Sequence, residues 1–183
     1  MSDERYVPLL VLGLGNVLCG DDGLGAVAVH ILQRRYRAPD GVLVLDGGTL
    51  GLSLLPNLEQ AREAILVDAI RTDGAPGSFV RLEGDDVAPA VAARLSVHQV
   101  GVLDLLEAAR WRERYPTRLV LLGLVPESLE LGVVRTRAVE AALDGLVDRI
   151  VAEARDLGHA FVPRGQCETA PFGPDDLAHV YGL

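Results

Sequence analysis

Residues 12–25 read LGLGNVLCGDDGLG and form a glycine-rich turn between two different apolar patterns. Before the turn, residues 7–14 are almost continuously apolar, which is typical of a parallel strand that is buried on both faces. After it, apolar residues recur at positions 24, 27, 28, 31 and 32, which is the spacing of one face of a helix. The stretch therefore predicts a strand that passes directly into a helix, the opening unit of an α/β fold.

Alternating strand and helix patterns continue along the chain. Strands are expected at 42–45, 63–67, 78–82 and 119–125. Helices are expected at 50–58, from residue 98, and after Thr136, which can cap the last helix; residues 83–97 are expected to form a loop or lid with weak helical character. This order predicts a three-layer α/β sandwich, in which a mostly parallel, twisted sheet carries helices on both faces.

The composition fits a single domain with a full hydrophobic core. The chain has 183 residues, of which 49% are hydrophobic. We expect one α/β domain over residues 1–158. Residues 159–183 contain repeated proline and glycine without periodicity, and we expect them to form an irregular tail.

Charge and cysteine content argue against several classes of protein. Seventeen basic against 26 acidic residues give a net charge of −9, which disfavours nucleic-acid binding. Cys19 and Cys167 are far apart, so we expect neither a disulfide framework nor a thiolate zinc site, and a reducing compartment. The acidic N-terminus does not read as a signal peptide, and no apolar run reaches the roughly 20 residues that span a bilayer. We therefore expect a cytoplasmic protein with no membrane partner.

The turn itself carries two adjacent carboxylates. In a dinucleotide-binding fingerprint, glycines at such a turn let a pyrophosphate reach the helix N-terminus. Here Asp21 and Asp22 would repel a phosphate, and Leu18 stands where the fingerprint has its third glycine. Asp46 is placed like the ribose-binding acid of those folds, but Gly47 beside it also suits a tight turn. The pattern favours a cation, with capping of the following helix by either carboxylate as the alternative.

Three more short segments follow this turn: Asp46-Gly47-Gly48-Thr49, Val67-Asp68-Ala69 and His98-Gln99-Val100-Gly101. Together with residues 13–25, their order and spacing resemble the hydrogenase maturation proteases, over about residues 9–155. These are endopeptidases that trim the C-terminus of the large subunit of nickel-iron hydrogenases. The resemblance implies a metal-dependent endopeptidase that acts on a hydrogenase large-subunit precursor. It also implies that nickel carried by the precursor is the recognition signal, and we expect no nucleotide cofactor.

The resemblance extends to a site. The family's metal-binding trio carries over to Asp22, Asp68 and His98, which become the expected catalytic residues and metal ligands. Two carboxylates and one imidazole suit nickel, zinc or cadmium. Ordinary roles stay open as well, because Asp68 can end a strand in a turn and His98 can be a hydrogen-bonded loop histidine.

Asn16, Asp46 and Gly47 are weaker candidates for substrate binding. The Asn16 side chain can bridge loop amides, and the turn at Gly47 can be approached by a substrate backbone. Cys19 is expected to stay a protonated thiol, since the neighbouring carboxylates raise its pKa. His30 lies on the first helix without a partner pattern and is expected to be incidental.

Two rival functions stay open at this point. One is a small nucleotide-binding oxidoreductase or transferase, and the other is a non-catalytic, nickel-dependent maturation chaperone. The sequence contains neither a Gly-x-Ser-x-Gly elbow nor a His-Glu-x-x-His motif, so serine and ordinary zinc protease mechanisms lack support.

Overall fold

The computed structural model describes residues 7–92, 97–165, 176 and 180–181. A five-stranded sheet with the order β3-β1-β4-β6-β5 runs through the centre of the molecule. Its strands are β1 (Val7–Leu14), β3 (Val42–Gly48), β4 (Ala61–Ala69), β5 (Phe79–Glu83) and β6 (Arg118–Leu124). β3, β1, β4 and β6 are mutually parallel, whereas β5 pairs antiparallel with β6 at one edge.

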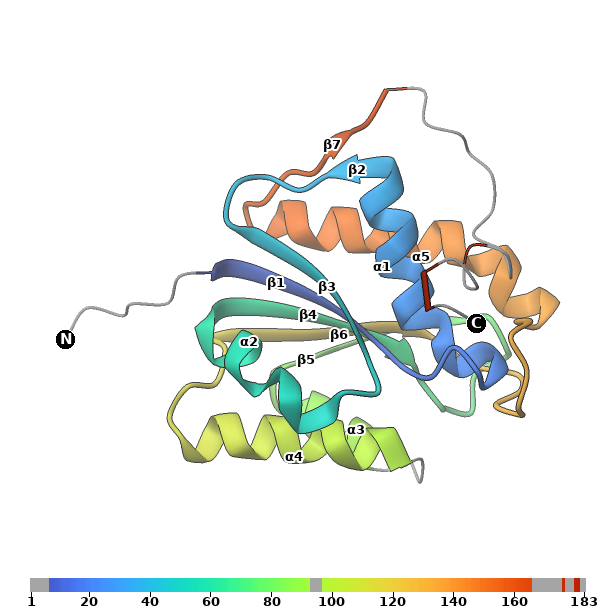
Figure 1. Cartoon of the computed structure of the whole chain (residues 1–183), viewed down its shortest axis with the longest axis horizontal. Helices are drawn as coiled ribbons and strands as arrows, with labels where there is room; N and C mark the ends of the chain where they lie inside the picture. Colours follow the sequence, from blue (N-terminus) through green and yellow to red (C-terminus); the bar gives the residue numbers. More distant parts are fainter. Residues whose placement is uncertain (1–6, 93–96, 166–175, 177–179, 182–183) are drawn as a thin grey trace.

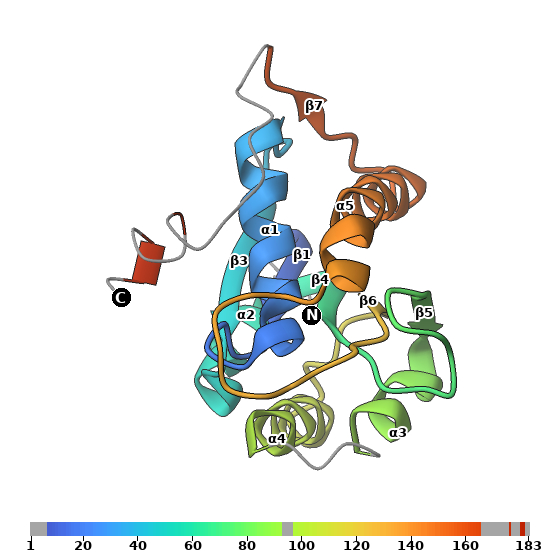
Figure 2. The same ribbon diagram turned by 90° about the vertical axis from the view of Figure 1, so that its right-hand side faces the viewer.

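Helices cover both faces of this sheet (Figures 1 and 2). One face carries α1 (Leu24–Arg35) and α5 (Arg137–Asp156). The other carries α2 (Leu55–Gln60), α3 (Val87–Ala92) and α4 (Val97–Trp111). The predicted three-layer α/β sandwich is confirmed.

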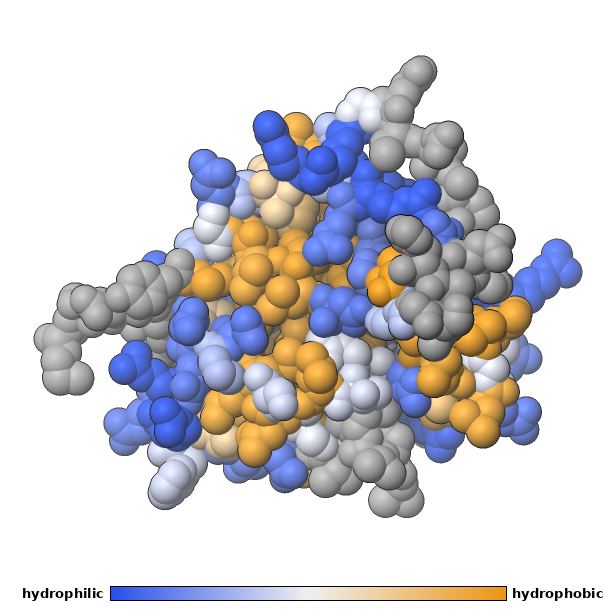
Figure 3. Space-filling view, viewed as in Figure 1, coloured by the Kyte–Doolittle hydropathy of each residue, from blue (hydrophilic) through white to orange (hydrophobic). Residues whose placement is uncertain are grey.

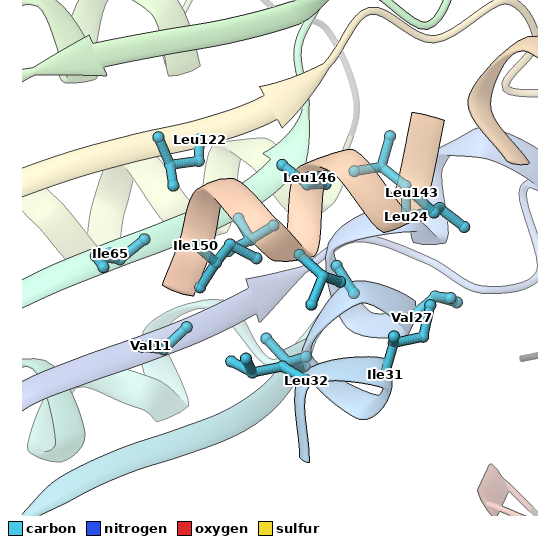
Figure 4. Close-up of a cluster of buried hydrophobic side chains, with 14 of the residues drawn as sticks. Val11, Leu24, Val27, Ile31, Leu32, Ile65, Leu122, Leu143, Leu146 and Ile150 are labelled. Atoms are coloured by element: carbon cyan, nitrogen blue, oxygen red, sulfur yellow. The ribbon is translucent and has the colours of Figure 1, made fainter. Parts of the chain in front are cut away.

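Two apolar cores lie on either side of the sheet. In β1, Val11 belongs to the core beneath α1 and α5, and the next residue, Leu12, belongs to the opposite core. Figure 4 shows the first core, where Val11, Ile65 and Leu122 from three neighbouring strands face α1 and α5. Burial on both faces explains why the central strands read as unbroken apolar runs.

The structure differs from the sequence prediction in the end of β3, in the helix expected over 50–58 and in the direction of β5. β3 extends to Gly48, because its pairing with β1 continues to Leu14. The helix expected over 50–58 is divided into a 3₁₀ turn, η2 (Gly51–Leu54), and α2, whose first turn contains Pro56. Proline lacks the amide that a continuous helix would need there, so it is placed at a helix start. The edge strand β5 is antiparallel, which its apolar pattern does not specify.

The chain after α5 returns to the end of α1. A short strand that the sequence does not predict, β7 (Val162–Pro163), pairs antiparallel with β2 (Tyr36–Arg37). The Arg164 side chain then donates from Nε to the carbonyl oxygens of Gln33 and Tyr36, both at 3.1 Å. These contacts satisfy carbonyls at the C-terminal end of α1. Within the described residues, no helix has the length and apolar character needed to cross a bilayer.

Candidate active site

The turn after β1 brings the backbone of Asp22 and the side chain of Asp68 close to one glycine. Gly15 has φ +113°, and its amide donates to the carbonyl oxygen of Gly48 at 3.0 Å. A Cβ at Gly15 would lie 1.8 Å from the carbonyl oxygen of Asp22 and 3.6 Å from Oδ1 of Asp68. Asp22 and Asp68 therefore meet beside Gly15, at the carboxyl edge of the sheet, where open parallel sheets bind their ligands.

Two more glycines allow this close approach. A Cβ at Gly25 would lie 2.1 Å from the carbonyl oxygen of Val67, and one at Gly13 would lie 2.4 Å from the carbonyl oxygen of Gly25. The first turn of α1 thus touches the backbones of β1 and β4 directly. Any side chain at Gly25 would push α1 away from the strand that carries Asp68.

Both carboxylates are buried but hydrogen-bonded to nearby backbone. Asp22 is 3% exposed, and its Oδ2 accepts a 2.9 Å hydrogen bond from the amide of Asn16. Asp68 is 1% exposed, and its Oδ1 accepts from the amide of Ala69 at 2.8 Å. Buried carboxylates at a shared edge concentrate negative charge, which favours binding of a cation there.

The third predicted ligand, His98, belongs to the first turn of α4, and its side chain lies outside the described residues. A Cβ at Gly51 would lie 3.1 Å from the Cα of Gly101, so the start of α4 packs against η2. Since η2 follows the carboxyl end of β3, this backbone position is at the predicted edge of the sheet. Among the described side chains, no group of three or more His, Cys, Asp or Glu residues could hold a metal ion. The trio Asp22, Asp68 and His98 stays a prediction.

Asp21 has a structural role that the sequence did not indicate. Its Oδ2 accepts from the amides of Glu127 and Ser128 at 2.9 and 3.1 Å, and from the Thr136 hydroxyl at 2.8 Å. Its Oδ1 accepts from the Thr136 amide at 2.7 Å. The N-cap residue of α1 is Gly23, which has no side chain that could accept from the helix amides. The interpretation that Asp21 or Asp22 caps this helix is therefore wrong. Thr136 is the N-cap residue of α5 but makes no side-chain capping bond, and its hydroxyl donates to Asp21 instead.

The loop that Asp21 holds also pairs with the turn through its backbone. The amide of Gly20 donates to the carbonyl of Gly132 at 2.7 Å, and the amide of Gly132 donates to the carbonyl of Leu18 at 2.8 Å. Residues 125–136 are therefore fixed against residues 18–21. This arrangement holds the glycine-rich turn, and with it Asp22, in one place.

The three weaker candidates line one pocket. Asn16, Asp46 and Gly47 contribute to a cavity of about 430 Å³ between the turn after β1 and the turn after β3. The Oδ1 of Asn16 accepts from the amide of Leu18 at 3.0 Å, so its side chain stabilises the turn locally. A part in substrate binding stays a prediction for all three.

Asp46 is the centre of a cluster that sequence reasoning missed. Its Oδ2 lies 2.9 Å from Nε2 of His30 and also accepts a hydrogen bond from the hydroxyl of Tyr181. Its Oδ1 accepts from the amide of Gly48 at 3.0 Å. The expectation that His30 is incidental was wrong. Spacing could not reveal this, because the three side chains are separated by 16 and 135 residues along the chain.

The cluster perturbs two pKa values in opposite directions. Burial opposes ionisation of Asp46, but the hydrogen bonds from His30, Tyr181 and Gly48 outweigh it and lower the pKa of Asp46. Burial and the hydrogen bond to the Asp46 carboxylate raise the pKa of Tyr181. Asp46 therefore accepts hydrogen bonds as a carboxylate while Tyr181 donates as a phenol.

Cys19 does not have the environment of a nucleophile. Burial raises the pKa of its thiol, and the negative charge of Asp22 raises it further. A thiol nucleophile needs the opposite, a base or a positive charge that stabilises the thiolate.

Comparison with known proteins gives this site a family. The family model described as HycI, hydrogenase maturation protease, matches residues 27–153. The chain belongs to the hydrogenase maturation protease family. It is accordingly a protease, specifically an endopeptidase.

Individual relatives of this maturation protease are similar over most of its length. The Hydrogenase 2 maturation protease of Escherichia coli (strain K12) is 38% identical over 157 residues, which cover 85% of this chain and 96% of the relative. The hydrogenase expression/formation protein HoxM of Azotobacter vinelandii is 40% identical, over 81% of this chain and 77% of the relative. The solved structure of the hydrogenase maturating endopeptidase HybD from E. coli aligns with a TM-score of 0.83 and 36% identity, over 86% of this chain and 98% of that one.

Proposed function

We propose that this endopeptidase removes a C-terminal peptide from the large-subunit precursor of a nickel-iron hydrogenase after nickel has been inserted. The observation that carries the proposal is the meeting of Asp22 and Asp68 beside Gly15, at the carboxyl edge of a maturation-protease fold. In an open parallel sheet, this edge is where a substrate reaches the side chains that follow the strands.

In this proposal, Asp22, Asp68 and His98 contact the nickel that the precursor carries. Carboxylate oxygens and an imidazole nitrogen are ligands that a borderline divalent cation accepts. Three such ligands without a thiolate form a modest site. The enzyme alone would therefore hold nickel weakly and recognise it best when the precursor supplies the other ligands.

The bound cation would also assist cleavage of the peptide bond. A divalent metal beside the scissile bond polarises its carbonyl or lowers the pKa of an attacking water. Asp22 and Asp68 are already fixed by backbone hydrogen bonds before substrate arrives, so little reorganisation is needed in the reaction. Cys19 contributes no thiolate in this scheme, because its pKa is raised.

Nickel-loaded and nickel-free precursor, each incubated with the purified enzyme, test this proposal. We expect cleavage of the loaded precursor alone, seen as a lower intact mass. Equal cleavage of both forms would contradict nickel recognition. Tight binding of loaded precursor without any change in mass would instead identify a chaperone.

A further inference from the structure

The cavity next to the carboxylates has one wall that comes from the far end of the chain. The pocket of about 430 Å³ is formed by residues 15–18, residues 46–50 and Tyr181. Its rim is apolar, since Leu18 is 42% exposed and Leu50 is 60% exposed. Figure 3 shows part of the apolar surface at this end of the molecule. It is the end toward which the parallel strands β1, β4 and β6 run in Figure 1. A cavity of this size is within the range of pockets that take small ligands.

Tyr181 is held in this wall by several contacts. Its hydroxyl donates to Oδ2 of Asp46 and lies 3.4 Å from Nε2 of His30. The rings of Tyr181 and His30 meet edge to face, with centroids 5.9 Å apart and an interplanar angle of 86°. Such aromatic pairs are favourable beyond the area that they bury.

The C-terminal segment is also attached to α1 before it reaches Tyr181. Arg164 donates to carbonyl groups at the end of α1, and Asp176 accepts from Nη1 of Arg34 at 3.3 Å. These contacts follow α1 from its last turn back toward His30. The family model matches residues 27–153, so Tyr181 lies outside the matched region.

The pocket adjoins the carboxylate site through the turn after β1, although Asp22 and Asp68 are not among its lining residues. Gly15 and Asn16 line the pocket, and the same two residues lie next to Asp22 and Asp68. The amide of Asn16 donates to Asp22, and Gly15 separates the backbone of Asp22 from the Asp68 side chain. A peptide that occupies the pocket would therefore lie against the turn that holds Asp22 and borders Asp68.

We propose that Tyr181 is a specificity-determining residue, which completes a pocket for an apolar side chain of the precursor next to its scissile bond. This inference rests on the proposed function. Val17, Leu18 and Leu50 supply apolar contact, and the Tyr181 ring closes the side that the signature turns leave open. Asp46 already accepts hydrogen bonds on both oxygens from this chain, and its negative charge disfavours an acidic occupant.

The test compares Tyr181→Ala and Tyr181→Phe with the unchanged enzyme in cleavage of nickel-loaded precursor. Loss of the ring in Tyr181→Ala is expected to raise KM roughly tenfold, as for truncation of a buried aromatic anchor, with kcat within about twofold. Tyr181→Phe keeps the ring and is expected to stay within about threefold in KM. Tyr115→Ala is the matched control, because Tyr115 packs on Arg110 at the opposite end of β6 and should change neither constant.

The dissociation constant of the precursor is measured for the same variants, and circular dichroism checks their folding. An unchanged KM and dissociation constant in Tyr181→Ala would overturn the inference. Tighter precursor binding by Tyr181→Ala would overturn it as well, because the tail would then compete with substrate. If the unchanged enzyme binds precursor without cleaving it, the proposed function fails, while the effect of Tyr181→Ala on the dissociation constant still decides this inference.

Discussion

Replacing Asp21 should lower the free energy of unfolding strongly, because this residue has a structural role. Its neighbour Asp22, in contrast, is one that we assign to catalysis. The Asp21 side chain is fully buried and accepts hydrogen bonds from three amides and one hydroxyl, all in the loop before α5. In Asp21→Ala these four donors lose their acceptor, and each unsatisfied buried donor costs about 1–3 kcal/mol.

The sum of these four costs is an upper limit for the loss of stability. The donors are partly buried, so water replaces some of the lost bonds, and removing the buried charge relieves its desolvation cost. We therefore expect the free energy of unfolding to fall by about 3–5 kcal/mol in Asp21→Ala. Asp21→Asn should lose about 2 kcal/mol, because its amide NH₂ places a donor against a donor.

Equilibrium urea denaturation, followed by circular dichroism, measures this loss. Asp22→Asn is the matched neighbour, and we expect it to lose less than about 1 kcal/mol, because the amide oxygen still accepts from Asn16. Asp148→Ala, on the exposed side of α5, controls for removal of a carboxylate. The reasoning would be refuted if Asp21→Ala were as stable as Asp148→Ala.

Three further predictions concern the turn and the tail. Cys19→Ala should cleave precursor at nearly the unchanged rate, because the pKa of the thiol is raised; a loss above about a hundredfold in a folded variant would indicate thiol catalysis. Gly25→Ala should destabilise the fold strongly in urea denaturation, since its Cβ would lie 2.1 Å from a β4 carbonyl oxygen, whereas Gly145→Ala, with open space on α5, should gain up to about 1 kcal/mol. Equal stability of the two variants would contradict the close packing of α1. Tyr181 should ionise above the ordinary tyrosine pKa of about 10, so its contribution to stability is present below pH 10 and is lost as pH rises toward the raised pKa. The difference in absorbance at 295 nm between the unchanged protein and Tyr181→Phe measures this, and ionisation of Tyr181 near pH 10 would contradict it.

The sequence predicts the parts of this fold that depend on local patterns. β1, the glycine turn and α1 are adjacent in the chain, and their apolar spacing defines both elements. The division between η2 and α2 was missed, because Pro56 stands within an otherwise helical pattern. The edge strand β5 was predicted at 78–82, but its antiparallel direction was not, because strand direction depends on the path of the connecting loop, which an apolar pattern does not encode.

The candidate site, like the fold, is predictable from the sequence only where it depends on local patterns. The Asp21–Asp22 pair marks the turn as functional, but only the fold shows that Asp21 binds a loop more than 100 residues away. The cluster of His30, Asp46 and Tyr181 has no signal in spacing, since its members come from a helix, a strand end and the C-terminal segment. Side chains that meet only through tertiary structure cannot be paired from one sequence.

The intact mass of nickel-loaded large-subunit precursor, before and after incubation with this enzyme, tests the central claim most directly. We expect the unchanged enzyme to reduce the mass by that of a C-terminal peptide. Asp68→Asn, which keeps an oxygen to accept from the amide of Ala69, should fold normally and leave the mass unchanged. An unchanged mass with the unchanged enzyme, or equal cleavage by folded Asp68→Asn, would contradict the account.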